Sequence, residues 1–160
     1  MLKKSDRKPY LIIRVAKDCG HCKHLEEIKF FDWLLPQLSK DFDIRFSEVE
    51  HRVLGDPELP AIFNYPTFVP YFMVMLPEIY DKIDQYPNTP IDELVHQVRF
   101  FNAIVGPTGE FMILKSAARN EDVIPFCYEA VKSLESMKGL GKNSVPVKYS
   151  RPHSKTNFKG

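Results

Sequence analysis

Two cysteines stand two residues apart in the segment KDCGHCKHL, residues 17–25. A cysteine reacts as its thiolate, and its ordinary pKa of about 8.5 leaves only a few per cent of the thiol ionised at neutral pH. Two thiols at this spacing can close into a disulfide and reopen, can bind a metal, or can pack as ordinary core residues. The chemistry of Cys19 and Cys22 is therefore the first question that the chain raises.

The residues around the pair favour redox chemistry. A thiolate at Cys19 would lie at the N-terminus of a predicted helix, facing unpaired N–H groups and the positive end of the helix dipole. His21, when protonated, and Lys23 add positive charge, so the Gly20-His21 dipeptide favours donation or isomerisation of disulfides over simple reduction. We predict that Cys19 is the accessible nucleophile, and that Cys22 is shielded and resolves the mixed disulfide.

Other roles for the cysteines have less support. A zinc site needs about four ligands, and beyond the pair the sequence offers only Cys127 and the scattered histidines His24, His51, His96 and His153, so we expect no metal and no cofactor. Cys127 shares the apolar face of the last predicted helix, where we expect it to pack in the core. Two purely structural cysteines remain an alternative.

Apolar runs predict the strands that position the pair. We expect a buried strand at residues 10–16, interrupted by Arg14, and a second strand at 43–50. A further buried strand is expected at 67–76, where Pro70 must lie at an end or a bulge. The turn residues 106–109 predict a hairpin that continues into a β-rich run.

Helical spacing of apolar residues predicts the other elements. We expect a long helix from Cys22 to about Lys40, kinked at Pro36, a helix from Pro90 to about Phe101, and a closing helix over 120–137. Residues 77–90, with three prolines and scattered charge, are predicted to be a loop.

Charge divides the chain into two parts. The 160 residues are 44% hydrophobic and 27% charged, which is typical of one globular domain. From Lys138 onward there are six basic residues and no acidic one, so 16 basic and 21 acidic residues remain in the body. We expect a basic flexible tail over 138–160, free to contact nucleic acid or an acidic partner. No apolar run has the roughly 18 residues of a membrane span, and the N-terminus does not resemble a secretory signal, so we expect a cytoplasmic protein.

The segment CGHCKHL resembles the active site of the protein disulfide isomerase branch of the thioredoxin superfamily. NYPTF, residues 64–68, resembles that family's G-Y-P-T segment, whose proline is cis and packs against the redox pair. The resemblance implies that Cys19 attacks, that Cys22 resolves, and that Pro66 is the cis-proline, with Tyr65 and Thr67 beside it in the substrate groove.

The resemblance also implies an α/β, thioredoxin-like fold, a central mixed sheet flanked by helices. We expect an N-terminal arm over residues 1–9, the domain over 10–137, and an insertion over 77–105 after the cis-proline strand. In an alternative reading FFNAIVGPTGEFMILKS, residues 100–116, is itself the family's hairpin.

Two positions depart from the family pattern. Asp18 replaces the usual tryptophan and would disfavour a thiolate at Cys19, and Ile13 replaces a buried acid. These departures favour a second hypothesis, a redox-inactive binding or scaffold protein that uses the insertion and the basic tail. A glutaredoxin-like protein is a weaker third hypothesis, because the C-x-x-C holds no tyrosine.

The predicted function is thiol–disulfide exchange with protein substrates through the CGHC pair, supported by an upstream redox partner. Disulfides in a cytosol are usually transient, so such a protein reduces substrates, serves an unusual compartment, or works in a system that makes its own disulfides. This divergent chain resembles the thioredoxin-like proteins of large DNA viruses, which assemble in the cytoplasm; a virus assembly site or virion is then the expected location. The sequence leaves the oligomeric state open.

Overall fold

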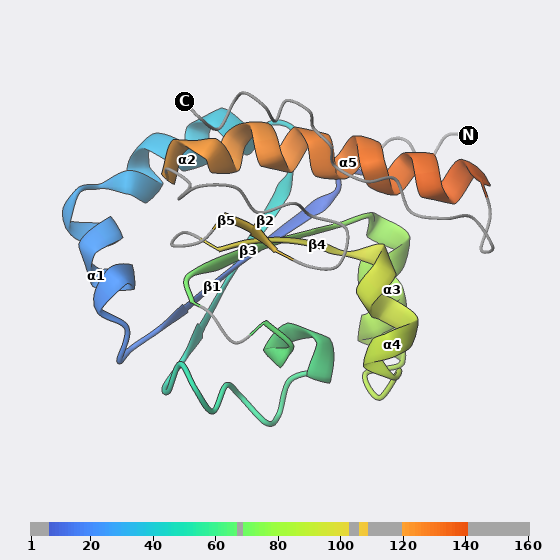
Figure 1. Cartoon of the computed structure of the whole chain (residues 1–160), viewed down its shortest axis with the longest axis horizontal. Helices are drawn as coiled ribbons and strands as arrows, with labels where there is room; N and C mark the ends of the chain where they lie inside the picture. Colours follow the sequence, from blue (N-terminus) through green and yellow to red (C-terminus); the bar gives the residue numbers. More distant parts are fainter. Residues whose placement is uncertain (1–6, 67–68, 103–105, 109–119, 141–160) are drawn as a thin grey trace.

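The computed structural model describes residues 7–66, 69–102, 106–108 and 120–140 (Figure 1). Its centre is a five-stranded mixed sheet with the strand order β2-β1-β3-β4-β5. β1 (Tyr10–Ala16) pairs in parallel with β2 (Asp43–Val49) and antiparallel with β3 (Tyr71–Met75); β4 (Arg99–Asn102) and β5 (Gly106–Thr108) continue antiparallel. The predicted class, α/β with a mixed sheet flanked by helices, is confirmed.

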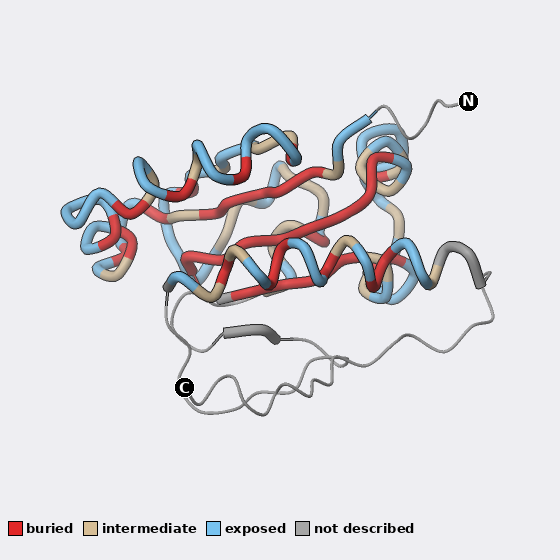
Figure 2. The backbone as a smooth tube through the Cα atoms, turned by 90° about the horizontal axis from the view of Figure 1, so that it is seen from above, coloured by how far each residue is buried: buried red, intermediate tan, exposed pale blue. Residues whose placement is uncertain are grey.

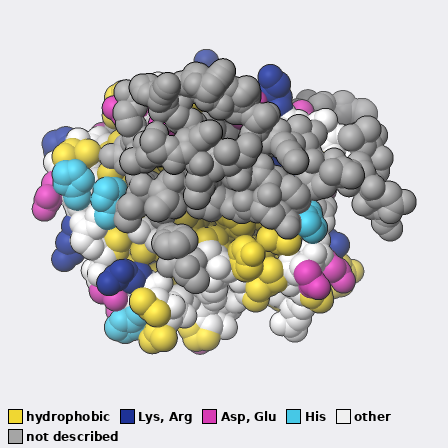
Figure 3. Space-filling view, viewed as in Figure 1, with side chains coloured by type: hydrophobic (Ala, Val, Ile, Leu, Met, Phe, Trp, Pro, Cys, Tyr) yellow, Lys and Arg dark blue, Asp and Glu magenta, His cyan; other side chains and the backbone are white. Residues whose placement is uncertain are grey.

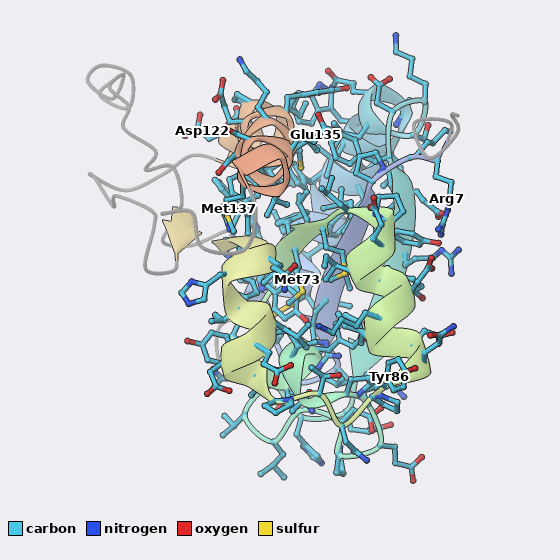
Figure 4. All side chains as sticks on the ribbon, turned by 90° about the vertical axis from the view of Figure 1, so that its right-hand side faces the viewer. Arg7, Met73, Tyr86, Asp122, Glu135 and Met137 are labelled. Carbon is cyan, nitrogen blue, oxygen red and sulfur yellow. A yellow bond between two sulfur atoms is a disulfide. The ribbon has the colours of Figure 1, made fainter. Side chains whose placement is uncertain are left out.

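Helices cover both faces of this sheet, and the strands are buried between them (Figure 2). α2 (Phe30–Leu38) and α5 (Val123–Leu140) lie over one face and close the first core, which includes Leu11, Ile13, Phe72 and Phe101. The second core fills the other face, beneath α3 (Pro77–Gln85), α4 (Ile91–Leu94) and the 3-10 turn Ala61–Asn64. Its members include Tyr10, Ile12, Ala16, Cys19, Cys22, Ile62 and Met73, the last lying between α3 and α4 in Figure 4.

The long helix expected from Cys22 to Lys40 is wrong, because the chain forms two helices. α1 (Gly20–Glu27) ends before Lys29, which takes a left-handed conformation with φ of 61°, and α2 starts at the next residue. Pro36 lies inside α2 rather than at the break. The change of direction allows Leu25 of α1 and Phe30 of α2 both to enter the first core.

The region after β3 also differs from the prediction. Residues 77–85, expected to be loop, form α3, because Pro77 occupies the first helical turn, where a proline needs no hydrogen-bond partner for its nitrogen. The helix expected to reach Phe101 ends at Leu94 and is followed by a short 3-10 turn. Residues 99–102 are strand β4, which pairs antiparallel with β3.

The closing helix is present where the sequence predicted one, after a 3-10 turn at Asn120–Asp122. It extends to Leu140, so the first three residues of the predicted tail belong to α5. The rest of that tail, residues 141–160, the β-rich run 111–116 and most of the N-terminal arm lie outside the described residues. On the face seen in Figure 3 the described apolar side chains gather centrally, and side chains of both charges lie around them.

Candidate redox site

Cys19 and Cys22 form a disulfide at the start of α1, with Cα atoms 5.3 Å apart. The Cys19 amide donates to the carbonyl of Ala16 at 3.3 Å, which fixes the turn leaving β1. Cys19 is the N-cap of α1, and its Sγ accepts a hydrogen bond from the Cys22 amide at 3.0 Å. The sulfur therefore takes the place of a capping oxygen at the positive end of the helix, where a thiolate would be stabilised. The prediction that a helix starts within the pair is confirmed.

Both cysteines are buried in the oxidised protein. Cys19 is 3% exposed and Cys22 is 5% exposed, and both belong to the second core. The expected contrast between an accessible Cys19 and a shielded Cys22 is therefore wrong for this state. The reason is that Cys19 caps the helix with its side chain turned back over the apolar face of the sheet, beside Val69.

The residues between and after the cysteines have different surroundings. Gly20 is exposed, and a Cβ placed there would meet nothing within 4 Å, so open space adjoins the pair on this side. The His21 ring lies 5.8 Å from the His24 ring, and its Nε2 is buried without a hydrogen-bond partner among the described residues. Lys23 is exposed, and its amide donates to the Cys19 carbonyl at 3.2 Å.

Asp18, which was expected to disfavour a thiolate at Cys19, contacts the loop after β2. One carboxylate oxygen accepts a hydrogen bond from the Arg52 amide at 2.8 Å, and the other lies 3.8 Å from Nδ1 of His51. The carboxylate thus ties the loop after β2 to the residue before Cys19. The hydrogen bond from the Arg52 amide offsets part of this negative charge and so reduces its effect on the neighbouring sulfur.

The cis-proline expected at Pro66 is wrong. The described cis peptide bond joins Val69 and Pro70, directly before β3, and the Val69 carbonyl oxygen lies 3.9 Å from the Cys19 Sγ. The Y-P-T match selected the wrong proline because β3 begins only at Tyr71, so the residue next to the strand is Pro70. Tyr65 is 46% exposed with its ring 5.8 Å from that of Phe100, and Thr67 lies outside the described residues.

Sequence reasoning missed a polar group on the same face of the sheet. Arg14 is 2% exposed, and its Nη1 donates to Oδ1 of Asn64 at 2.7 Å. Its Cζ lies 5.8 Å from the centre of the Tyr71 ring, and the Tyr71 hydroxyl donates to the carbonyl of Phe63 at 2.6 Å. Burial raises the pKa of Tyr71, so this phenol stays neutral. The available signal was the single charge in the apolar run YLIIRVA.

Cys127, the third cysteine, is a free thiol and lies apart in the first core. It is 0% exposed, and burial raises the pKa of its thiol. Among the described residues, no group of three or more histidine, cysteine or acidic side chains is placed to hold a metal ion. The packing expected for Cys127 is confirmed.

Comparisons with known proteins assign no family to this chain. No protein-family model and no curated protein matches this sequence. Within the described part of the chain, no helix has both the length and the apolar character needed to cross a membrane.

Proposed function

We propose that this protein is a thiol–disulfide oxidoreductase with a thioredoxin-like fold, in which Cys19 and Cys22 cycle between disulfide and dithiol during exchange with protein substrates. The observation that carries the proposal is the disulfide at the N-terminus of α1, where the Cys22 amide donates to the Cys19 Sγ. A structural disulfide has no need of a helix N-terminus, whereas a reactive thiolate gains stability there.

The arrangement of the elements supports the same proposal. The resemblance implies a strand, a C-x-x-C helix, a second strand and then a cis-proline that leads into a third strand. In this protein β1, α1, β2 and β3 follow that order, with β2 parallel and β3 antiparallel to β1. β4 then pairs antiparallel with β3, as a hairpin partner would.

The chemistry proceeds in two exchange steps. In the reduced protein the Cys19 thiolate attacks one sulfur of a substrate disulfide, which forms a mixed disulfide and releases the other substrate sulfur as a thiolate that takes up a proton. The Cys22 thiolate then attacks the Cys19 sulfur, breaks the mixed disulfide and releases the second substrate thiolate. The protein ends as its disulfide and the substrate has gained two electrons. The reverse sequence donates a disulfide, and the reduction potential decides the direction.

A redox titration of the full chain tests this function. In a Cys127→Ser background, which leaves only the pair, the protein is equilibrated in glutathione buffers and its free thiols are trapped with a maleimide. We expect one reversible two-electron transition, between about −270 and −180 mV, the range from thioredoxin to protein disulfide isomerase. Cys19→Ser should reduce turnover of a protein disulfide to background, whereas Cys22→Ser should still attack and accumulate a mixed disulfide.

The burial of both sulfurs favours the second candidate, a scaffold with a structural disulfide. A scaffold would keep the disulfide closed over the whole buffer range, or would open it without turning over any protein disulfide. Either result would overturn the proposed oxidoreductase. A midpoint near −180 mV would indicate an oxidant or isomerase, and one near −270 mV would indicate a reductant.

A further inference from the structure

Arg14 is a buried cation with no acidic partner among the described residues. Only its Nη1 has a hydrogen bond, to the neutral amide of Asn64, while Nε and Nη2 have none among the described residues. Burying a charge is costly unless it is paired and fully hydrogen-bonded. The described contacts of the Arg14 side chain are this hydrogen bond and the Tyr71 ring, 5.8 Å from Cζ, and neither partner carries a negative charge.

A second buried arginine shows the contrast. Arg99 of β4 is also 2% exposed, but it donates to Oγ of Ser133 and to the carbonyl oxygens of His96 and Val98 at 2.9–3.3 Å. Arg99 lies toward α5, on the face of the first core, because its partner Ser133 belongs to that helix. The two residues therefore provide a matched pair, one bonded on several sides and one not.

Arg14 lies on the face of the sheet that holds the disulfide. Side chains two apart in a strand share a face and lie about 7 Å apart, so Arg14 is next to Ala16, whose carbonyl accepts from the Cys19 amide. Arg14 is also the register partner of Tyr71, two residues after Val69, whose carbonyl oxygen lies 3.9 Å from the Cys19 Sγ. Arginine and disulfide thus share the 69–71 segment.

Among the described residues, the other polar groups near Arg14 supply no negative charge to balance it. Asn64, the last residue of the 61–64 turn, and Ser47, the register partner of Arg14 on β2, are neutral. Tyr71 on β3 is a phenol that donates to a carbonyl oxygen. Asp18 is directed to the loop after β2. From α1, His21 is the ionisable side chain nearest the pair in sequence, and Lys23 is exposed.

We propose that Arg14 is a positioning residue that supplies the positive charge needed by the reduced form of the Cys19–Cys22 pair, and so makes the disulfide a stronger oxidant. This inference rests on the proposed function. Reduction by glutathione breaks the S–S bond with two electrons from two glutathione thiols, which leave joined as glutathione disulfide. Of the two protons that they release, one stays on Cys22 and the other goes to solvent, which leaves a thiolate at Cys19. That thiolate is the anion that Arg14 stabilises.

The test compares variants of the full chain in the Cys127→Ser background. Arg14→Met removes the charge and keeps a long side chain, Arg14→Lys keeps the charge, and Arg99→Met removes the matched arginine. We expect Arg14→Met to lower the equilibrium constant for reduction by glutathione about tenfold, a shift of about 30 mV to more negative potential. Arg14→Lys should stay within about threefold of the parent, and Arg99→Met should leave the constant unchanged.

Three results would overturn the role of Arg14. They are an unchanged constant in a folded Arg14→Met protein, an equal shift in Arg99→Met, and a tenfold loss in Arg14→Lys. If Arg14→Met does not fold, Arg14→Gln, which is neutral but can still bond Asn64, takes its place with the same expectation. If the parent itself shows no reversible transition, both this role and the proposed function fall. If the parent shows a reversible transition whose midpoint Arg14→Met does not shift, only the role of Arg14 falls.

Discussion

At the scale of single residues, Gly55 connects the loop after β2 to the polar group beneath the site. Its φ of 68° lies in the left-handed region, and a Cβ at this position would come 2.5 Å from Oδ1 of Asn64. That same oxygen accepts from Arg14 and from the Asp56 amide, while the Asn64 amide donates to the Asp56 carbonyl. The absence of a side chain at Gly55 thus leaves room for Asn64, the described hydrogen-bond partner of Arg14.

We predict that Gly55→Ala lowers the free energy of unfolding by about 1–3 kcal/mol, because it adds left-handed strain and forces Asn64 to move. Urea denaturation of the oxidised protein measures this change. Gly20→Ala is the control: position 20 opens a helix, and a methyl group there contacts nothing within 4 Å. The control should be neutral or slightly stabilising, and equal losses in both variants would contradict the argument.

At the scale of elements, the break between α1 and α2 shows where local sequence is a poor guide. The segment EEIKFF contains no glycine or proline, and its apolar spacing continues through the break, so a single helix was predicted. The break is imposed by tertiary packing, because Leu25 and Phe30 must both enter the first core. Pro77 misled in the other direction, since the segment that it begins was predicted to be loop and forms a helix.

Lys29 takes the left-handed backbone conformation at this break, which is unfavourable for a residue with a side chain. We predict that Lys29→Gly raises the free energy of unfolding by about 0.5–1 kcal/mol, because glycine avoids the left-handed penalty of about 1–2 kcal/mol but loses more backbone entropy on folding. Chemical denaturation measures the change. Glu26→Gly, an exposed helical position three residues earlier, should destabilise by about 1 kcal/mol. A Lys29→Gly protein less stable than the parent would contradict this explanation.

At the scale of the whole molecule, the sheet separates two cores, and the Cys19–Cys22 disulfide lies in the second. This explains what the sequence could predict. The apolar runs of β1 and β3 and the C-x-x-C segment are local features. They were sufficient to predict the α/β fold class and the Cys19–Cys22 pair. The pairing partner of β4, the burial of Cys19 and the choice between Pro66 and Pro70 depend on contacts between distant segments, which no local pattern contains.

The separation predicts different consequences for two fully buried side chains. Leu34→Ala in the first core and Ile62→Ala in the second should each lower the free energy of unfolding by about 2–5 kcal/mol. Two thiols need more room than a disulfide, so the space left by Ile62 should favour reduction by at least about threefold, while Leu34→Ala leaves the equilibrium unchanged. Glutathione titration of both variants measures this, and an equal response would mean that the cores are coupled through the sheet.

Two kinds of laboratory selection should favour different residues at position 14, because the guanidinium of Arg14 is buried. Replacing buried charged groups with aliphatic ones of similar volume is often neutral or stabilising by about 1–4 kcal/mol. A library screened only for survival at high temperature should therefore accumulate leucine or methionine at position 14. A library screened for disulfide transfer should retain arginine or lysine there. In this protein the most thermostable sequence and the most oxidising sequence would then differ at the same codon.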